Sequence, residues 1–313
     1  MKIIRTVLGD IAPSSLGLTL GHDHLITHPP PDVTDQDLVM DNLAATIQEL
    51  ESFKNAGGGG LVEMTTVDYG RDASELEQVS RASGVHVIAA TGFNKGSFAD
   101  RLTATKSLEE IVVWLVAEVQ DGLNMFSLAQ PRAESSRARA GIIKASSGLN
   151  GANPHELKVF EAAVQAHLAT NAPISTHTEK GTWGLEQAQF FLEHQVAPQK
   201  VLIGHLDLKP DLVYLLEIAA TGVNLGLDQF GKEKYLPDLD RINLVVKLCE
   251  AGFASQIILG GDMARKSYFK AYGGFPGLAH IPTTIRGMLE VAGIPSHAML
   301  FDNPRRWLAF DAI

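Results

Sequence analysis

Short apolar runs rich in β-branched residues alternate along the chain with longer stretches whose apolar residues recur every three to four positions. The first pattern is typical of buried strands and the second of amphipathic helices. Eight runs predict strands, at Leu16–His24, Gly60–Thr66, Val85–Thr91, Gly141–Ala145, Pro173–His177, Val201–His205, Val223–Asp228 and Gln256–Asp262. Helices are expected at Asp41–Lys54, Ala73–Ala82, Leu108–Gln120, Pro154–Ala169, Gly184–Glu193, Pro210–Ala219, Leu239–Ala251 and Thr283–Ala292, with a short capped helix at Asn303–Leu308.

This alternation of strand and helix predicts parallel βαβ units. Eight units favour a closed (β/α)8 TIM barrel over an open doubly wound sheet, and no G-x-G-x-x-G turn follows the first strand. The glycine run Gly57–Gly60 precedes a strand instead of opening a helix, so we interpret it as a flexible turn. No linker or internal repeat divides the 313 residues, and we expect residues 1–313 to form a single barrel domain.

Composition narrows the functional classes. Hydrophobic residues make up 45% of the chain and charged residues 20%, as in ordinary folded proteins. The net charge of −10 argues against a nucleic-acid partner, so an anionic substrate would need a local cluster of cations. Cys249 is the single cysteine, which fits a reducing compartment. Met1–Asp10 contains no apolar leader and the longest apolar run, Ile111–Ala117, is too short to span a bilayer, so we expect a cytoplasmic protein.

Candidate chemistry begins at the end of the first predicted strand. His22 and His24 are separated by one residue, and alternate side chains of a strand point to the same face. Two imidazoles at this spacing can bind one metal ion. The alternative is a strand end that carries two surface histidines, and H-x-H alone does not separate the two.

Four further polar residues lie at or near the ends of other predicted strands: Lys144, His177, His205 and Asp262. In a (β/α)8 barrel the C-terminal strand ends meet on one face, where the active sites of this fold lie. Each residue also has a structural alternative: a hydrogen-bonded histidine, an aspartate that caps a turn, or a lysine that snorkels to solvent. Together they favour a metal site, because so many metal-compatible residues at one end of a barrel rarely arise by accident.

Lys144 requires separate chemistry, because an ammonium group cannot ligate a metal. Burial inside a barrel favours the neutral amine, which can react with carbon dioxide to form a carbamate with two anionic oxygens. Such a group could bridge two metal ions about 3.5–4 Å apart. Lys144 is therefore a candidate N6-carboxylysine.

The complete set resembles the binuclear metal centre of the phosphotriesterase family, in the amidohydrolase superfamily. That pattern has H-x-H on strand one, a carboxylated lysine on strand four, histidines on strands five and six, and an aspartate on strand eight. The resemblance extends to Val67–Asp72, Ala90–Gly92 and Thr176–Thr178, and thus covers essentially the whole chain. Asp23 departs from it, since members often carry Glu between the two histidines.

The resemblance implies a ligand set and a mechanism. One metal ion would be held by His22, His24, Lys144 and Asp262, and the other by Lys144, His177 and His205. The ions would be divalent, with zinc first and manganese, iron or cobalt as alternatives. A hydroxide bridging them would attack the substrate, and Asp262 would transfer the proton to the leaving group. A homodimer is a further expectation from the family.

The substrate must be inferred from loops, because several hydrolytic activities share this centre. The stretches Lys232–Tyr235 and Asp262–Tyr268 would place four cations and two phenols at the mouth of the barrel, either as a solvated charge run or as a clamp for an anion. The second stretch and Thr91–Gly96 resemble loops of the phosphorylated sugar lactonases in this family. By that resemblance Arg265, Tyr268 and a lysine, Lys234 in preference to Lys232, would hold a substrate phosphate.

We therefore expect a metal-dependent hydrolase that opens a phosphorylated aldono-1,4-lactone. The first alternative is an acyl-lactone hydrolase or phosphotriesterase of the same family, although Asn94 stands where acyl-homoserine-lactone hydrolases carry Tyr. A second alternative is a non-catalytic ligand-binding barrel, which would have no need for Lys144.

Overall fold

The computed structural model describes residues 1–124 and 136–311. Its centre is a sheet of eight parallel strands in the order β10-β9-β8-β7-β6-β5-β4-β3. The strands are β3 (Leu18–Asp23), β4 (Gly58–Glu63), β5 (His86–Gly92), β6 (Ile142–Ser147), β7 (Ile174–Thr178), β8 (Val201–Ile203), β9 (Asn224–Leu227) and β10 (Ile257–Leu259). The predicted (β/α)8 barrel is confirmed.

The barrel closes where β10 meets β3. The amide of Asp262 donates a hydrogen bond of 2.9 Å to the carbonyl of His22. The approach is close, because a Cβ atom added to Gly21 would lie 2.3 Å from Cγ2 of Ile258. A glycine is therefore required on β3 at this point.

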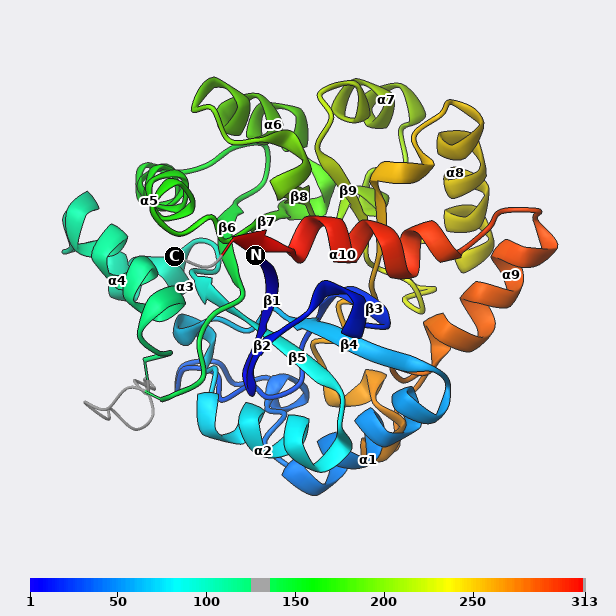
Figure 1. Cartoon of the computed structure of the whole chain (residues 1–313), viewed down its shortest axis with the longest axis horizontal. Helices are drawn as coiled ribbons and strands as arrows, with labels where there is room; N and C mark the ends of the chain where they lie inside the picture. The colour runs from blue at the N-terminus through cyan, green and yellow to red at the C-terminus, as the bar shows by residue number, and fades with distance from the viewer. Residues whose placement is uncertain (125–135, 312–313) are drawn as a thin grey trace.

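Helices surround the strands (Figure 1). They are α1 (Leu43–Asn55), α2 (Ala73–Ser83), α3 (Ser97–Thr103), α4 (Leu108–Gln120), α5 (Pro154–Thr170), α6 (Gly184–Glu193), α7 (Leu212–Ala220), α8 (Asp238–Glu250), α9 (Arg286–Val291) and α10 (Asn303–Leu308). Local sequence explains their starts: Asn153 caps α5 through the amides of His155 and Glu156, and Pro154 takes the first helical position.

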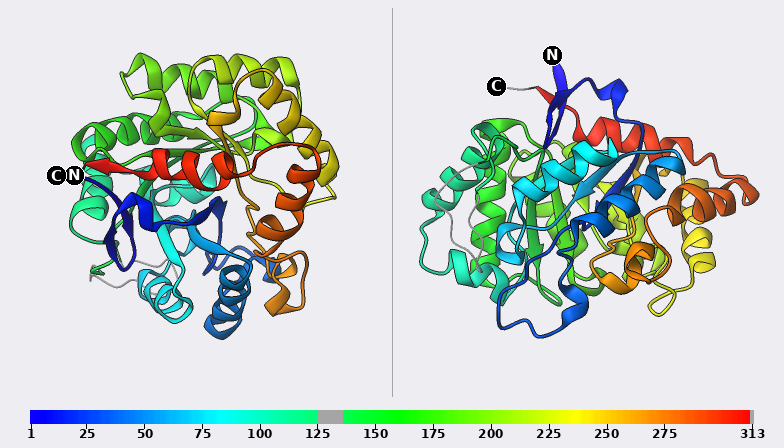
Figure 2. Two further views of the ribbon diagram at one scale, coloured as in Figure 1. Left: turned by 45° about the vertical axis from the view of Figure 1, so that its right-hand side comes forward. Right: turned by 90° about the horizontal axis from the view of Figure 1, so that it is seen from below.

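One end of the barrel is covered by α10, which crosses the strands in Figure 1 and lies with β1 at the same end in the right-hand view of Figure 2. Trp307 of α10 is fully buried against barrel residues such as Ile142 and Leu202. Its indole nitrogen donates a hydrogen bond of 3.2 Å to the carbonyl of Ile174. This end is therefore filled by packing, and the opposite end is left for the strand-end polar residues.

Some elements differ from the sequence prediction. The strands predicted to run to His205 and Asp262 end at Ile203 and Leu259, because both polar residues have positive φ angles, 60° and 44°, that no strand accommodates. The expected helix at Thr283–Ala292 begins as a π-helical turn, Ile281–Ile285, before α9.

The small sheet of β1 (Lys2–Thr6), β2 (Gly9–Ile11) and β11 (Phe310–Asp311) and the helix α3 were not predicted. Their segments are short and lack a clear apolar period.

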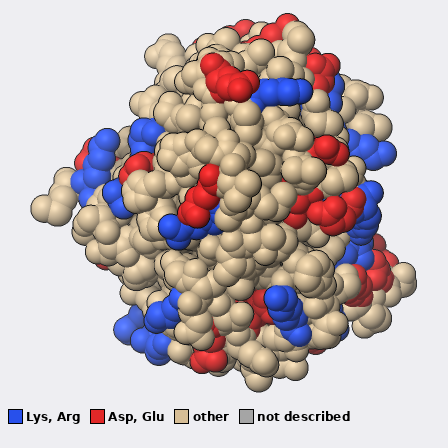
Figure 3. Space-filling view, turned by 90° about the vertical axis from the view of Figure 1, so that its right-hand side faces the viewer, with Lys and Arg blue, Asp and Glu red and all other residues tan. Residues whose placement is uncertain are grey.

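In the described part of the chain, no helix is both long enough and apolar enough to cross a membrane. On the face that carries α8 and α9, basic and acidic side chains are interspersed (Figure 3).

Replacing Trp307 tests how much the covered end contributes to stability. Trp307→Ala should lower the free energy of unfolding by about 3–5 kcal/mol, because it leaves a cavity and removes the hydrogen bond from the indole to the carbonyl of Ile174. Trp307→Phe, which keeps most of the ring but not the donor, should cost about 1 kcal/mol. Denaturant unfolding measures both. Val113→Ala on the exposed face of α4 is the control and should change stability by less than about 0.5 kcal/mol.

Candidate metal centre and substrate cavity

The two histidines of the first barrel strand point the same way, as predicted. His22 lies in β3 and His24 follows it directly, and both are buried. Their Nε2 atoms lie 3.6 Å and 3.3 Å from the same atom, Oδ1 of Asp262. Asp262 thus links both histidines across the closure of the barrel.

The other two histidines complete the cluster. The ring of His205 lies 4.6 Å from that of His22 and 4.5 Å from that of His177. His22, His205 and Asp262 each offer one donor atom within 4.8 Å of the others, the spacing at which a single metal ion could be held. The structure therefore brings His177 and His205 together with His22, His24 and Asp262, which lie at or just after the ends of β3 and β10.

Lys144 lies below this cluster on β6. It is buried, and its Nζ donates a hydrogen bond of 3.0 Å to the carbonyl of Met64. Burial lowers the pKa of Lys144, although the charges of Asp262 and Asp68 oppose the shift. The side chain thus meets the condition for carbamate chemistry, a lysine driven towards its neutral amine.

The protonation states of the cluster suit a divalent metal. Burial lowers the pKa values of His22, His24 and His177, so these imidazoles are neutral. The pKa of Asp262 lies well below its usual range even though burial opposes the shift, because the charges of Lys232 and His205 favour the carboxylate. Imidazoles whose pKa values are lowered, beside an ionised carboxylate, are donors that suit zinc and related ions, so His22, His24, His177 and Asp262 fit the implied metals.

Asp228, directly after β9, supports two of the histidines from behind. Its Oδ1 lies 2.7 Å from Nδ1 of His205, and its Oδ2 lies 3.4 Å from Nδ1 of His22. A carboxylate in this position fixes the orientation of an imidazole ligand. The charge of Asp228 also raises the pKa of His205, against the effect of burial. Sequence analysis gave Asp228 no role, although it ends a predicted strand as His177 and His205 do.

Two residues of the loop after β9 donate hydrogen bonds to the other carboxylate oxygen of Asp262. Lys232 Nζ lies 2.6 Å from Oδ2 and Gln229 Nε2 lies 2.9 Å from it. Gln229 Oε1 also accepts a hydrogen bond of 2.9 Å from Lys232. Lys232 is buried, whereas Lys234, which the sequence favoured as a substrate ligand, is exposed at the rim with its Nζ 5.4 Å from the ring centre of Tyr268.

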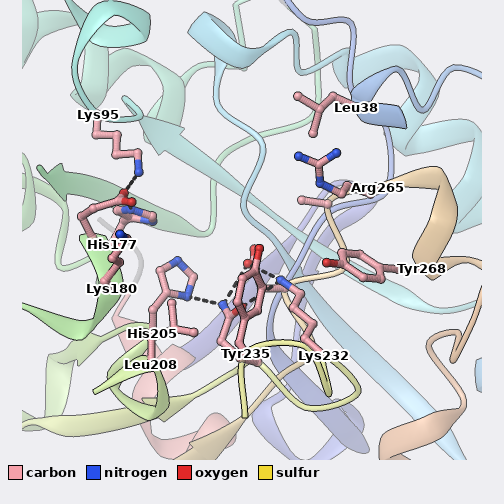
Figure 4. A pocket seen from close by; sticks show the side chains of 14 residues that line it. Leu38, Lys95, His177, Lys180, His205, Leu208, Lys232, Tyr235, Arg265 and Tyr268 are labelled. Atoms are coloured by element: carbon pink, nitrogen blue, oxygen red, sulfur yellow. Dashed lines mark hydrogen bonds and ion pairs between the residues drawn. The ribbon is translucent and has the colours of Figure 1, made fainter. Parts of the chain in front are cut away.

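A cavity of about 450 Å³ lies over the cluster (Figure 4). Its walls are formed by Leu38, Lys95, His177, Glu179, Lys180, His205, Leu208, Gln229, Lys232, Tyr235, Asp262, Ala264, Arg265 and Tyr268. In Figure 4, Lys95 and Lys180 lie on the side of His177, and Arg265 and Tyr268 lie on the opposite side. The cavity therefore carries cations on two opposite sides.

Several of these cations already have carboxylate partners. Lys95 pairs with Glu179, whose Oε2 also lies 3.3 Å from Nε2 of His177. Arg265 Nη1 lies 2.6 Å from Oδ2 of Asp35. The expected cluster of cations is present, but acidic residues neutralise part of its charge.

Comparison with known proteins agrees with this geometry. The model of the phosphotriesterase family matches residues 2–308. The chain belongs to the phosphotriesterase family. It is accordingly a hydrolase, and the resemblance drawn from its motifs is confirmed at the level of the family.

Three relatives within the phosphotriesterase family are informative. A phospho-furanose lactonase from Mycoplasmopsis synoviae is 36% identical, with 99% of this chain and 92% of the relative covered. The structure of a lactonase from Listeria monocytogenes is 30% identical with a TM-score of 0.90, covering 99% of each chain. The structure of the phosphotriesterase homology protein from Escherichia coli, with phosphate in its active site, is 32% identical with a TM-score of 0.87, covering 94% of this chain and 99% of that one.

A second group of possible ligands lies outside the barrel mouth, where His28 meets Asp72 and Glu75 at the start of α2. Its contacts explain it without a metal. Asp72 caps α2 by accepting a hydrogen bond from the amide of Glu75, and His28 Nε2 lies 2.6 Å from Oε2 of Glu75. That hydrogen bond raises the pKa of His28, although burial opposes the shift. The group therefore contains an ion pair, His28 with Glu75, that connects the loop after β3 to α2.

This ion pair makes a pH-dependent contribution to stability. Because the folded-state pKa of His28 is raised, the contribution is full below pH about 6.5 and is lost as pH rises through the raised value. His28→Gln should therefore lower Tm more at pH 5.5 than at pH 8.5. Thermal unfolding of both proteins at the two pH values measures the difference. An equal loss at both values would show that His28 contributes packing alone.

Proposed function

We propose that the chain is a binuclear metal-dependent lactonase that opens a sugar lactone bearing a phosphate group. The observation that carries the proposal is the cavity itself, because the same cavity is lined by the candidate metal ligands His177, His205 and Asp262 and by the phosphate-binding candidates Lys232, Arg265 and Tyr268. Relatives point the same way, since one is a phospho-furanose lactonase and another holds phosphate in its active site. The cationic wall suits a phosphate better than the acyl chain or neutral triester of the alternatives.

In this proposal, one ion would be held by His22, His24, Lys144 and Asp262, and the other by Lys144, His177 and His205. The amine of Lys144 forms a bond to the carbon of carbon dioxide and loses a proton, which leaves a carbamate with two oxygens. Zinc suits these donors, and manganese, iron or cobalt are accepted by the same set. When bound, such ions lower the pKa of water and polarise a carbonyl oxygen.

The protein residues then supply position and proton transfer. Asp262, ionised at neutral pH, accepts the proton of the attacking water and returns it to the ring oxygen when the lactone C–O bond breaks. Gln229 and Lys232 hold Oδ2 of Asp262, so its carboxylate keeps one orientation towards the cavity. Arg265 and Tyr268, with Lys232 or Lys234, bind the phosphate at the opposite wall from His177.

Metal content tests the catalytic part. Purified protein should carry about two transition-metal ions per chain, and removal of metal by a chelator should abolish lactone hydrolysis until zinc is restored. His22→Ala and Lys144→Ala should each lower both the metal content and kcat. Elemental analysis beside activity assays measures this, with His194→Ala, exposed at the end of α6, as the control. Full activity in a metal-free preparation would refute the mechanism.

Phosphate recognition is tested through Arg265. Arg265→Ala should lower kcat/KM for a phosphorylated lactone roughly tenfold to a hundredfold, because one charge-assisted hydrogen bond contributes about 1.5–3 kcal/mol. The loss on the unphosphorylated form of the same lactone should be small, since the contact is not made there. Both forms are assayed at one fixed ionic strength. A wild-type preference for unphosphorylated or acyl lactones would move the assignment to the alternative activity.

A further inference from the structure

Arg265 is held from outside the cavity by the loop that follows β3. The short 3₁₀ helix Gln36–Leu38 begins at Asp35, whose Oδ1 accepts the amide of Asp37 at 3.1 Å and whose Oδ2 lies 2.6 Å from Nη1 of Arg265. Oδ2 of Asp37 lies 3.4 Å from the same Nη1. Two carboxylates from the loop after β3 (the first loop) therefore contact one nitrogen of Arg265, which lies in the loop after β10.

The contact also orders the backbone beside Arg265. Asp37 accepts hydrogen bonds from the amide of Ser267 at 2.8 Å and from its hydroxyl at 2.7 Å. Leu38, at the end of the same short helix, lines the cavity with Arg265 and Tyr268. The first loop thus fixes both the side chain of Arg265 and the segment that leads to Tyr268.

Asp35 and Asp37 both contact Nη1 of Arg265, which leaves the other nitrogens of the guanidinium group for a substrate phosphate. A guanidinium group has a planar fork of five N–H donors, and its Nε–Nη2 edge can bind two phosphate oxygens at once. Within residues 1–124 and 136–311, no hydrogen bond joins Nε or Nη2 of Arg265 to an acceptor. The side chain of Arg265 is one-third exposed, so without its partners it would sample many rotamers.

We propose that Asp35 and Asp37 are positioning residues for substrate specificity: they hold Nη1 of Arg265 so that its remaining edge is presented to the phosphate of the substrate. This proposal rests on the proposed function, because it assumes a phosphorylated lactone. It adds a determinant of specificity from the loop after β3, outside the candidate metal centre, because the side chain of Asp35 contacts Asp37 and Arg265. Fixing the arginine in advance removes an ordering cost from binding, so the contribution belongs to KM.

The test variant is Asp35→Asn, which removes the charge but keeps an oxygen that can accept the amide of Asp37. Its matched control is Asp32→Asn. Asp32 lies in the same loop and pairs with Arg101, which does not line the cavity. Both aspartates are exposed, so both variants should keep the Tm of the wild type.

For the phosphorylated lactone, Asp35→Asn should raise KM about threefold to tenfold with little change in kcat, and Asp32→Asn should leave KM unchanged. The preference for the phosphorylated over the unphosphorylated lactone should fall by the same factor. In an Arg265→Ala background, adding Asp35→Asn should cause no further loss, because the arginine that Asp35 positions is gone. Asp35→Glu should recover part of the preference.

Two results would overturn the proposal. One is an unchanged KM in Asp35→Asn. The other is an equal loss from Asp35→Asn with and without Arg265, which would mean that Asp35 acts through loop structure. Failure of the proposed function looks different, because the wild type would then show no preference for the phosphorylated lactone and Arg265→Ala would affect both forms alike. That result would refute the proposed function and, with it, the proposed role of Asp35.

Discussion

The hydrogen bond from the amide of Asp262 to the carbonyl of His22 is the contact on which the rest of the structure depends. It joins the first and the last strand of the barrel, and so converts an open sheet into a closed one. The same two residues meet again through their side chains, with Nε2 of His22 3.6 Å from Oδ1 of Asp262. The contact that closes the barrel therefore also brings the side chains of His22 and Asp262 together, and the same two strands approach closely where Gly21 meets Ile258.

Burying this many charged groups is stable only if each has a partner. Asp228 orients His205, and the loop that carries Asp228 is itself held by Asp207, which accepts the amides of Asp228 and Gln229 at 3.3 Å and 3.0 Å. Asp207 is fully buried and pairs with Arg241 of α8 at 2.8 Å. A chain of ion pairs and backbone hydrogen bonds thus runs from Arg241 on α8 through Asp207 and Asp228 to His205, and it supports the site.

The sequence predicted the barrel because apolar period and strand length are local signals, and each of the eight strands carries them. It also predicted that His22, His24, His177, His205 and Asp262 would lie together, because strand ends of a closed barrel must converge. The left-handed turns at His205 and Asp262 were not predictable, since only tertiary contacts stabilise a positive φ in such residues. The sequence favoured Lys234 over Lys232 as the substrate ligand, but both lie in one short loop, and only its folded path buries Lys232 beside Asp262 and places it in the cavity lining.

Chemistry and specificity are consequently carried by different parts of the chain. The groups around Asp262 are fixed by strands and by backbone hydrogen bonds, so they tolerate little change. Arg265, in contrast, is positioned by side chains from a loop more than two hundred residues away in sequence, through contacts that are partly exposed. Exposed ion pairs are individually weak, so a small change in the first loop can redirect the arginine without disturbing the barrel. In the proposed function, this division lets one set of metal ligands serve different lactones, because the loops hold the remainder of the substrate.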